Sequence, residues 1–395
     1  MVDIRTGRPK VVVLGMMSKH PVAGVVWQTL HYLVGFERLG YEAYYVEAGA
    51  HQPSSMLVPD GSAGDRSEAA AQFIDGHLRR FDLGDRWAFH ALQSDTRCYG
   101  LTESELQHLY GSAALIINLH GATQPLPEHS ATGRLIYLET DPVRLQLELA
   151  TNLQNAVDFL EPHVAFFTFG ENYGRPDCGL PVSDQFTFKP TRQPVVLDFW
   201  EPYARGEGSS FTTIGNWRQW REVTFEGELY YWSKHLEFLK FLNLPTRTGR
   251  QFELALSRLD TSERQLLESH GWRVRDALSF SMDLDAYRCC IAGSRGEFTV
   301  AKDQNIRLRS GWFSDRSATY LACGRPVVTQ ETGFTSILPT GAGLFAFSTT
   351  EEAAQAIEAI EADYSRHSAA ALQVARDYFS HEVVLTPLLA EVGLS

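Results

Sequence analysis

The chain has 395 residues, of which 44% are hydrophobic and 21% charged, and its formal net charge at pH 7 is −13. One hydrophobic core rarely grows beyond about 250–300 residues, so this length predicts two domains. The negative charge excludes a general affinity for nucleic acid or for anionic membrane surfaces, because both kinds of partner bind basic surfaces.

The sequence contains neither a membrane anchor nor a disulfide framework. Its apolar run at 11–17 is much shorter than a membrane span of about 20 residues and lacks a signal-peptide pattern. We therefore expect a cytoplasmic protein with no integral membrane segment. Five cysteines have neither disulfide nor zinc spacing, which predicts reduced thiols: Cys98, Cys178, Cys289, Cys290 and Cys323.

Strands and helices alternate in the first half of the chain. The pattern predicts a strand at 11–15, a loop at 16–24, a helix at 25–39 and strands at 41–46, 114–119, 135–138 and 164–169. A strand, helix and strand in this order form a βαβ unit with parallel strands. We expect a Rossmann-like domain with a doubly wound parallel sheet at 1–195.

A segment rich in proline and glycine, 174–208, predicts a linker, and a second α/β series follows it. Strands are predicted at 211–214, 252–256, 272–276, 298–301 and 326–329, and helices at 230–242, 262–270, 285–294 and 314–323. Thr349 and Glu352 have capping-box spacing and predict another helix start. We expect a second Rossmann-like domain at 205–375, facing the first across a cleft, and a candidate helix at 376–395 that packs back on the first domain.

One segment of the second domain has the chemistry of an anion site. Free N–H groups at a helix start bind phosphate oxygens, and a glycine allows close approach to the backbone. From Arg295 to Arg325 there are six basic residues and three acidic ones, so the local charge is positive. The residues expected at this helix start are Ser310, Gly311, Trp312, Phe313, Ser314 and Asp315.

This segment resembles the donor-binding part of the GT-B glycosyltransferases. The run A-C-G-R-P-V-V at 322–328 and the polar loop ending at Gly333 are similar to that family, and the order of elements matches it over about 209–375. The strings F-T-F-G-E-N at 167–172 and S-G-W-F-S-D-R-S at 310–317 also resemble a group of uncharacterised bacterial glycosyltransferases. The resemblance implies a sugar donor linked to UDP, or to TDP or GDP, and no metal or other cofactor.

The chain also departs from the better-known members of this family. Retaining members carry two glutamates eight residues apart, and plant-type inverting members carry a histidine and a glutamate at these places, where this chain has Gly311 and Thr319. Neither the residue that binds the ribose nor the stereochemical outcome follows from this segment.

Two residues of the first domain are candidates for the catalytic base. His20 lies in the loop after the first strand, where inverting GT-B enzymes place their histidine, and imidazole accepts a proton near neutral pH. Asp141 follows the strand at 135–138 and could orient this base or act as the base itself. The alternatives are a solvated loop histidine and an aspartate that caps the helix at 143–150.

Other candidates follow strand ends, where doubly wound sheets bind their ligands. His120, Glu171 and Asn172 are expected to contact the acceptor, with structural hydrogen bonding as the alternative. The remaining candidates for donor binding are Gly215, Asn216, Arg295, Lys302, Gln330, Glu331 and Thr332. Of these, Arg295 and Lys302 suit a diphosphate because both carry a positive charge.

Asp283 and Asp285 form a D-x-D motif, which holds a metal in GT-A glycosyltransferases. The motif directly precedes a predicted helix here, so we interpret it as a helix cap. The sequence therefore predicts a metal-independent glycosyltransferase that acts on a nucleotide-sugar donor and a small-molecule or glycan acceptor. Two alternatives remain open: a nucleotide-sugar epimerase or hydrolase on the same fold, and a non-catalytic nucleotide-sugar-binding protein.

Overall fold

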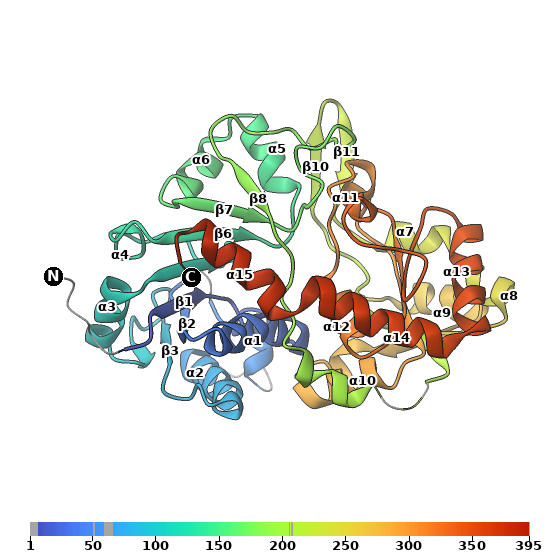
Figure 1. Ribbon diagram of the computed structural model, residues 1–395, viewed down its shortest axis with the longest axis horizontal. Coiled ribbons are helices and arrows are strands. Elements are labelled where there is room, and N and C mark those ends of the chain that lie inside the picture. Colours follow the sequence, from blue (N-terminus) through green and yellow to red (C-terminus); the bar gives the residue numbers. More distant parts are fainter. Residues whose placement is uncertain (1–6, 50–51, 59–65, 205, 207, 395) are drawn as a thin grey trace.

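The structure is a computed structural model that describes residues 7–49, 52–58, 66–204, 206 and 208–394. It contains two large, mainly parallel sheets, each covered by helices, and the C-terminal helices run from the second sheet to the first (Figure 1). The predicted fold class, two doubly wound α/β units, is confirmed.

The first sheet has the strand order β4-β3-β2-β1-β5-β6-β7-β8. All neighbouring strands are parallel except β3 and β4. Four of the five residues of β1 are buried, as expected for a central strand with helices on both faces. The strands are β1 (Lys10–Leu14), β2 (Glu42–Glu47), β3 (Trp87–His90), β4 (Cys98–Gly100), β5 (Leu115–Leu119), β6 (Leu135–Glu139), β7 (Ala165–Thr168) and β8 (Phe188–Pro190). The helices of this part are α1 (Ala23–Arg38), α2 (Arg66–Leu78), α3 (Glu103–Ser112), α4 (Pro127–Ser130), α5 (Arg144–Ala150) and α6 (Gln154–Leu160).

The second sheet has the order β13-β12-β9-β14-β15-β16, and all its neighbouring strands are parallel. Its strands are β9 (Ser210–Asn216), β12 (Gln251–Ser257), β13 (Trp272–Asp276), β14 (Gly296–Thr299), β15 (Val327–Gln330) and β16 (Leu344–Phe347). Its helices are α7 (His235–Lys240), α8 (Leu244–Thr248), α9 (Thr261–Ser269), α10 (Leu284–Ala292), α11 (Asp303–Arg307), α12 (Asp315–Ala322), α13 (Thr350–Ala362) and α14 (Tyr364–Val374).

Two predicted helix caps are present. Thr349 and Glu352 form the capping box of α13, and the Asp283 side chain accepts a hydrogen bond of 2.7 Å from the Ala286 N–H at the start of α10. The interpretation of the D-x-D motif as a helix cap is therefore confirmed for Asp283.

The segment predicted as one helix at 230–242 is different. Its first two residues end the strand β11 (Glu228–Tyr231), which forms an antiparallel hairpin with β10 (Glu222–Phe225), and α7 begins only at His235. Glu226 and Gly227 at the hairpin tip both have positive φ, which matches the twist of a tight two-residue turn. The hairpin lies where the two sheet units meet, beside α5 and α11 (Figure 1).

The C-terminal helix α15 (His381–Glu391) packs on α1 of the first unit. The two helices come so close at Gly35 that a Cβ atom there would lie 2.7 Å from Leu385 Cδ1. The bridge between Val195 and Ser380 joins the start of this helix to the connecting segment.

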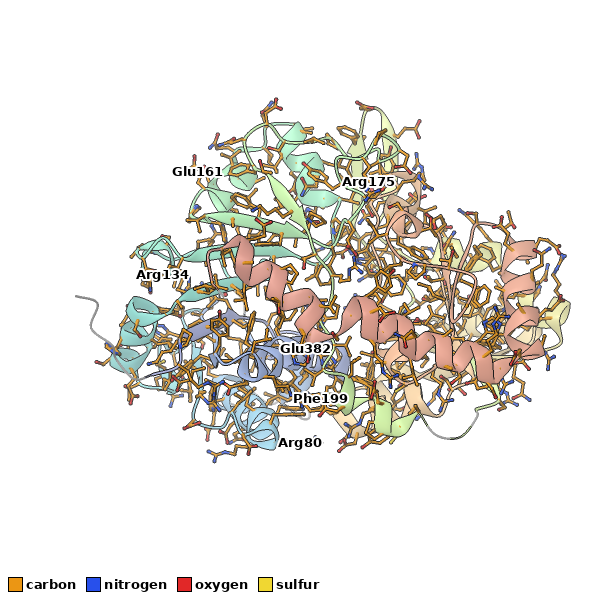
Figure 2. All side chains as sticks on the ribbon, viewed as in Figure 1. Arg80, Arg134, Glu161, Arg175, Phe199 and Glu382 are labelled. Carbon is orange, nitrogen blue, oxygen red and sulfur yellow. The ribbon has the colours of Figure 1, made fainter. Side chains whose placement is uncertain are left out.

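Aromatic packing closes the junction of the two units on the side opposite the hairpin. Phe199, labelled in Figure 2, lies in the segment between the two sheets. Its ring centre lies 5.7 Å from that of Trp27 of α1 and 5.3 Å from that of Phe81. The indole N–H of Trp27 donates to the Leu284 carbonyl of α10 at 3.2 Å. The two units therefore share one core at this end.

Candidate functional site

In each sheet the strand order reverses at one point, between β1 and β5 in the first and between β9 and β14 in the second. Ligands of doubly wound sheets bind in the crevice outside the carboxyl ends of the strands at such a point. His20 and His120 follow β1 and β5, and Asn216 and Lys302 lie at the ends of β9 and β14. The structure thus places predicted site residues from both units at the two reversal points.

An ion pair joins the two units at this place. The ammonium of Lys302 donates to Asp141 Oδ2, although the two residues lie 161 positions apart in the chain. Lys302 is buried, and its ammonium lies 4.1 Å from the centre of the Trp232 ring. Burial lowers the pKa of Lys302, and the charge of Asp141 acts in the opposite direction. The two candidates proposed separately for diphosphate binding and for proton transfer therefore contact each other.

The backbone that carries Asp141 is strained. Val143, two residues further on, has a φ of +110°, which a β-branched residue rarely adopts. Its side chain is fully buried in an apolar cluster with Leu308 and with Tyr230 of the hairpin. Packing between the two units therefore holds the turn that presents Asp141.

A second contact between the units involves Trp312. Its indole N–H donates to the Thr140 carbonyl at 3.0 Å, and the Thr140 hydroxyl lies 2.7 Å from His120 Nδ1. Burial, with a smaller contribution from His20, lowers the pKa of His120 to about 3. His120 is thus neutral at physiological pH. Its hydrogen bond with Thr140 links the end of β5 to the loop after β6 without adding a charge.

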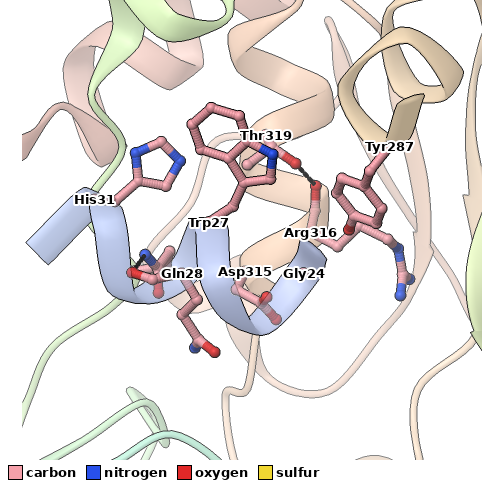
Figure 3. A pocket seen from close by; sticks show the side chains of 9 residues that line it. Gly24, Trp27, Gln28, His31, Tyr287, Asp315, Arg316 and Thr319 are labelled. Carbon is pink, nitrogen blue, oxygen red and sulfur yellow. Dashed lines mark hydrogen bonds between the residues drawn. The ribbon is translucent and has the colours of Figure 1, made fainter. Parts of the chain in front are cut away.

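The starts of two helices face each other in the junction. Gly24 and Gln28 of α1 line one small pocket together with Asp315 and Arg316 of α12 (Figure 3). In neither helix does the N-cap side chain accept a hydrogen bond from the first turn. Burial raises the pKa of Asp315, whose carboxylate accepts from the first N–H groups of its own helix.

Lys234 is a residue of this site that the sequence did not single out. It directly precedes α7, and its ammonium lies 5.4 Å from the centre of the Trp312 ring. Burial, with the charge of nearby Arg316, lowers the pKa of Lys234 to about 7. In the described part of the chain no carboxylate forms an ion pair with Lys234. The sequence signal for Lys234 is a lysine at the start of the first helix after β9. Because we predicted that helix at 230–242, Lys234 was placed within the helix and not at its start.

The fold was compared with known structures. An alpha-glucosyltransferase in complex with UDP matches with a TM-score of 0.58 and 10% identity, over 97% of this chain and 99% of that one. HepE of Anabaena, in complex with UDP and glucose, matches with a TM-score of 0.54 and 12% identity, over 98% and 99%. Sucrose-phosphate synthase of Thermosynechococcus elongatus matches with a TM-score of 0.53 and 12% identity, over 98% and 99%.

The chain has the GT-B glycosyltransferase fold. No protein-family model matches the sequence, and no curated protein matches it. Another structure of the alpha-glucosyltransferase, with a TM-score of 0.55 and 9% identity, also contains a 13-mer DNA. Over the described ranges, no helix is long and apolar enough to cross a membrane, and no group of His, Cys, Asp and Glu side chains could hold a metal ion.

The loop at Ser310 differs from the phosphate site that we expected within the GT-B fold. The Gly311 N–H donates to the Thr332 carbonyl at 2.7 Å, and the Trp312 N–H donates to the Ser310 hydroxyl at 3.3 Å. Ser310 is fully buried and donates to Asn305. A Cβ atom at Gly311 would lie 2.2 Å from the Asn172 nitrogen, so the glycine allows the two units to approach each other. We therefore do not assign the diphosphate to these two amides.

The candidate acceptor residues Glu171 and Asn172 have partners within the protein. Asn172 is fully buried, and its amide donates to the Arg309 carbonyl at 2.9 Å and to Asp177 at 3.1 Å. Glu171 pairs with Arg192 at 2.6 Å. Asn172 joins loops of the two units, Glu171 is paired within the first unit, and these contacts take up the hydrogen bonds that an acceptor would need.

Several donor candidates also have hydrogen-bond or packing partners within the protein. Arg295 precedes β14 and therefore lies at the amino end of this strand, away from the carboxyl ends where ligands bind. Its guanidinium donates to Glu361 at 2.7 Å. The Gln330 amide donates to Glu237 at 2.8 Å, and the Thr332 hydroxyl donates to the Trp312 carbonyl at 2.6 Å. Phe313 packs between Phe334 and Phe379, each at 5.3 Å.

The other donor candidates remain near the site. Asn216 is exposed at the end of β9 and accepts from the Ser257 hydroxyl, and Gly215 precedes it beside the Arg316 guanidinium. Glu331 accepts from the Gly333 N–H at 2.6 Å, and its other oxygen has no hydrogen-bond partner within the described chain. Ser314 is the buried N-cap residue of α12.

Proposed function

We propose that the protein transfers a sugar from a UDP-linked donor to a hydroxyl group of an acceptor. The observation that supports this most is the presence of two buried or partly buried ammonium groups at the junction of the sheet units, Lys234 beside Trp312 and Lys302 beside Trp232. Two cations suit a diphosphate, which carries several negative charges on few atoms. The choice of uridine rests on the UDP present in the alpha-glucosyltransferase and HepE structures.

In the proposed reaction an acceptor oxygen attacks the anomeric carbon of the donor sugar. A bond forms between that oxygen and the carbon, and the bond from the carbon to the diphosphate oxygen breaks. The hydroxyl proton passes to Asp141 or to His20 as general base. UDP leaves with the electron pair of the broken bond, and Lys234 and Lys302 stabilise its additional charge.

The ion pair of Lys302 and Asp141 suits this sequence of events. While the donor is absent, each group offsets the charge of the other at a partly buried place. A diphosphate that binds Lys302 provides an alternative partner for the ammonium, which leaves the Asp141 carboxylate available to accept a proton. Donor binding thus prepares the base.

Titration with UDP tests the proposal. We expect Lys234→Ala to weaken UDP binding about tenfold or more in calorimetry, because a charged hydrogen bond contributes about 1.5–3 kcal/mol. The matched control is Lys240→Ala on the same helix, where the side chain is 60% exposed and pairs with Glu237. We propose that these lysines replace a metal, so EDTA should leave the UDP affinity unchanged.

The outcomes separate this proposal from its alternatives. Equal UDP affinity in wild type and Lys234→Ala would refute the proposed diphosphate site. UDP binding without release of UDP from UDP-glucose, with any acceptor mixture, would favour a non-catalytic binding protein. A changed sugar without transfer would favour an epimerase.

A further inference from the structure

The loop that carries His20 is attached to the neighbouring strand by buried side chains. It runs from Gly15 to Val22, between β1 and α1, and β2 lies beside β1 in the sheet. Glu47 is the last residue of β2 and is only 5% exposed. It therefore lies at the carboxyl edge of the sheet, one strand away from the point where the strand order reverses.

Glu47 accepts hydrogen bonds from the backbone and from the side chain of Ser18. The Ser18 N–H donates to Oε1 at 2.8 Å, and the Ser18 hydroxyl donates to Oε2. The Ser18 carbonyl accepts from the Ser54 N–H at 2.9 Å. Ser18 is itself buried, so each of its polar groups has a partner within the protein and little contact with water.

Tyr45 of β2 adds a second attachment one residue earlier in the loop. Its hydroxyl donates to Glu47 Oε1 and accepts from the Met17 N–H at 2.8 Å. Both Tyr45 and Met17 are fully buried. The loop also starts directly against this ring, because a Cβ atom at Gly15 would overlap it. Glu47 and Tyr45 together therefore hold two consecutive amides of the loop.

The attached part of the loop leads directly to His20. This residue is exposed, and its N–H donates to the Met16 carbonyl at 3.1 Å, which closes a turn around the two held amides. Where the loop ends, the Ala23 N–H donates to the Ser281 carbonyl of the second unit at 2.6 Å. A general base must be held within hydrogen-bond reach of the proton that it abstracts, and a backbone held at both ends of the loop meets this need.

We propose that Glu47 is a positioning residue that holds the loop of His20 in place. This inference rests on the proposed glycosyltransferase function, in which His20 is one of the two candidate bases. A buried donor that loses its acceptor is costly, so removal of the carboxylate would make the present conformation of the loop unfavourable. His20 would then move, whereas the lysines proposed to bind the diphosphate would stay in place.

Hydrogen exchange measured by mass spectrometry tests the attachment without any activity. We expect the amides of Met17 and Ser18 to exchange slowly in the wild type and faster in Glu47→Ala. Glu47→Gln should retain the slow exchange, because glutamine keeps an acceptor oxygen and its amide can donate to the Ser18 hydroxyl. Tyr45→Phe should accelerate exchange at Met17 alone.

A double-mutant cycle with His20 separates a positioning role from a general loss of structure. We expect Glu47→Ala to leave the UDP affinity unchanged and to lower kcat for release of UDP from UDP-glucose by up to about 100-fold, the effect of a displacement of about 1 Å. In the His20→Ala background the same substitution should lower kcat no further, because Glu47 acts through His20. Glu47→Gln should retain most of the wild-type kcat.

The matched control is Glu42→Ala at the other end of β2. Glu42 also accepts a hydrogen bond from a tyrosine, the Tyr44 hydroxyl at 2.9 Å, but it lies at the amino end of the strand, away from the loop. This variant should change neither the exchange of the loop amides nor kcat.

Three results would overturn the inference: unchanged exchange of the loop amides in Glu47→Ala, a wild-type kcat in that variant, or a further loss of kcat in the His20→Ala background. If Glu47→Ala does not fold, Tyr45→Phe decides by the same measurements. A wild-type protein that neither binds UDP nor releases it from UDP-glucose would refute the proposed function, and with it the role of His20, even where exchange confirms the attachment.

Discussion

The burial of Lys234 has a cost in stability that the proposed diphosphate would offset. Its ammonium is partly buried near Arg316 and Lys302, so the charged form is unfavourable in the ligand-free protein. A diphosphate would supply the missing negative charge. Groups with strongly shifted pKa values gather at functional sites, and at Lys234 burial outweighs the opposing charges of Glu297 and Asp315.

We predict that Lys234→Met raises the free energy of unfolding at pH 6 and that this gain shrinks as the pH rises above 7. Below its folded pKa of about 7, Lys234 is charged in both states, and the native state bears the full cost of burial. Above pH 7 the unfolded chain retains a proton that the native state has lost, so the wild type gains up to about 1.4 kcal/mol per pH unit. Urea unfolding from pH 6 to pH 9 measures this, with Lys240→Met as control. A gain that is independent of pH would contradict the lowered pKa.

At the scale of elements, glycine has different roles in two helices. Gly35 lies where α1 meets α15, with Leu385 and His381 directly opposite, whereas Gly76 of α2 has open space around the position of its Cβ. Glycine within a helix costs about 0.5–1 kcal/mol relative to alanine. That cost is offset only at Gly35, by the close packing of the C-terminal helix.

Alanine substitutions at these two positions should therefore change the free energy of unfolding in opposite directions. Gly76→Ala should raise the free energy of unfolding by about 0.5–1 kcal/mol. Gly35→Ala should lower it by about 1–3 kcal/mol, because the added methyl would lie 2.7 Å from Leu385 Cδ1 and 3.1 Å from His381 Cβ. Denaturant unfolding of both variants measures the difference. Equal stabilisation would show that α15 does not pack on α1 as described.

Charge is distributed unevenly over the whole molecule. A net charge of −13 coexists with two cations at the junction of the units, Lys234 beside Trp312 and Lys302 beside Trp232. Such a molecule attracts a compact anion into the junction but repels an extended polyanion from its surface. The alpha-glucosyltransferase with the same fold was solved with DNA, which makes this a useful contrast.

We predict that the protein does not bind a labelled DNA duplex tighter than about 10⁻⁴ M at physiological salt, the weak limit for nonspecific binding. Fluorescence anisotropy measures this, and UDP binding under the same conditions shows that the site is intact. Micromolar DNA affinity that falls steeply with salt would reveal a basic surface that the charge distribution does not suggest.

The sequence by itself determined the architecture of the protein. Apolar runs of strand length, helical spacing and turn residues predicted two α/β units, and the predicted strand at 272–276 has the same bounds as β13. The cap at Asp283 was also predictable, because capping depends only on residues within one helical turn. Such features are local, so a short window of sequence contains their causes.

Only the tertiary structure decided which residues form the site. Lys302 meets Asp141 across 161 positions, and Trp312 meets Thr140 across 172, because the two sheets bring their strand ends together. Gly311 was predicted to admit a phosphate, but its missing side chain makes room for Asn172 from the other unit. Lys234 lies between the hairpin and α7, whereas the predicted helix at 230–242 included both Lys234 and the last residues of the hairpin. These contacts depend on how the two units pack, and no local pattern encodes that packing.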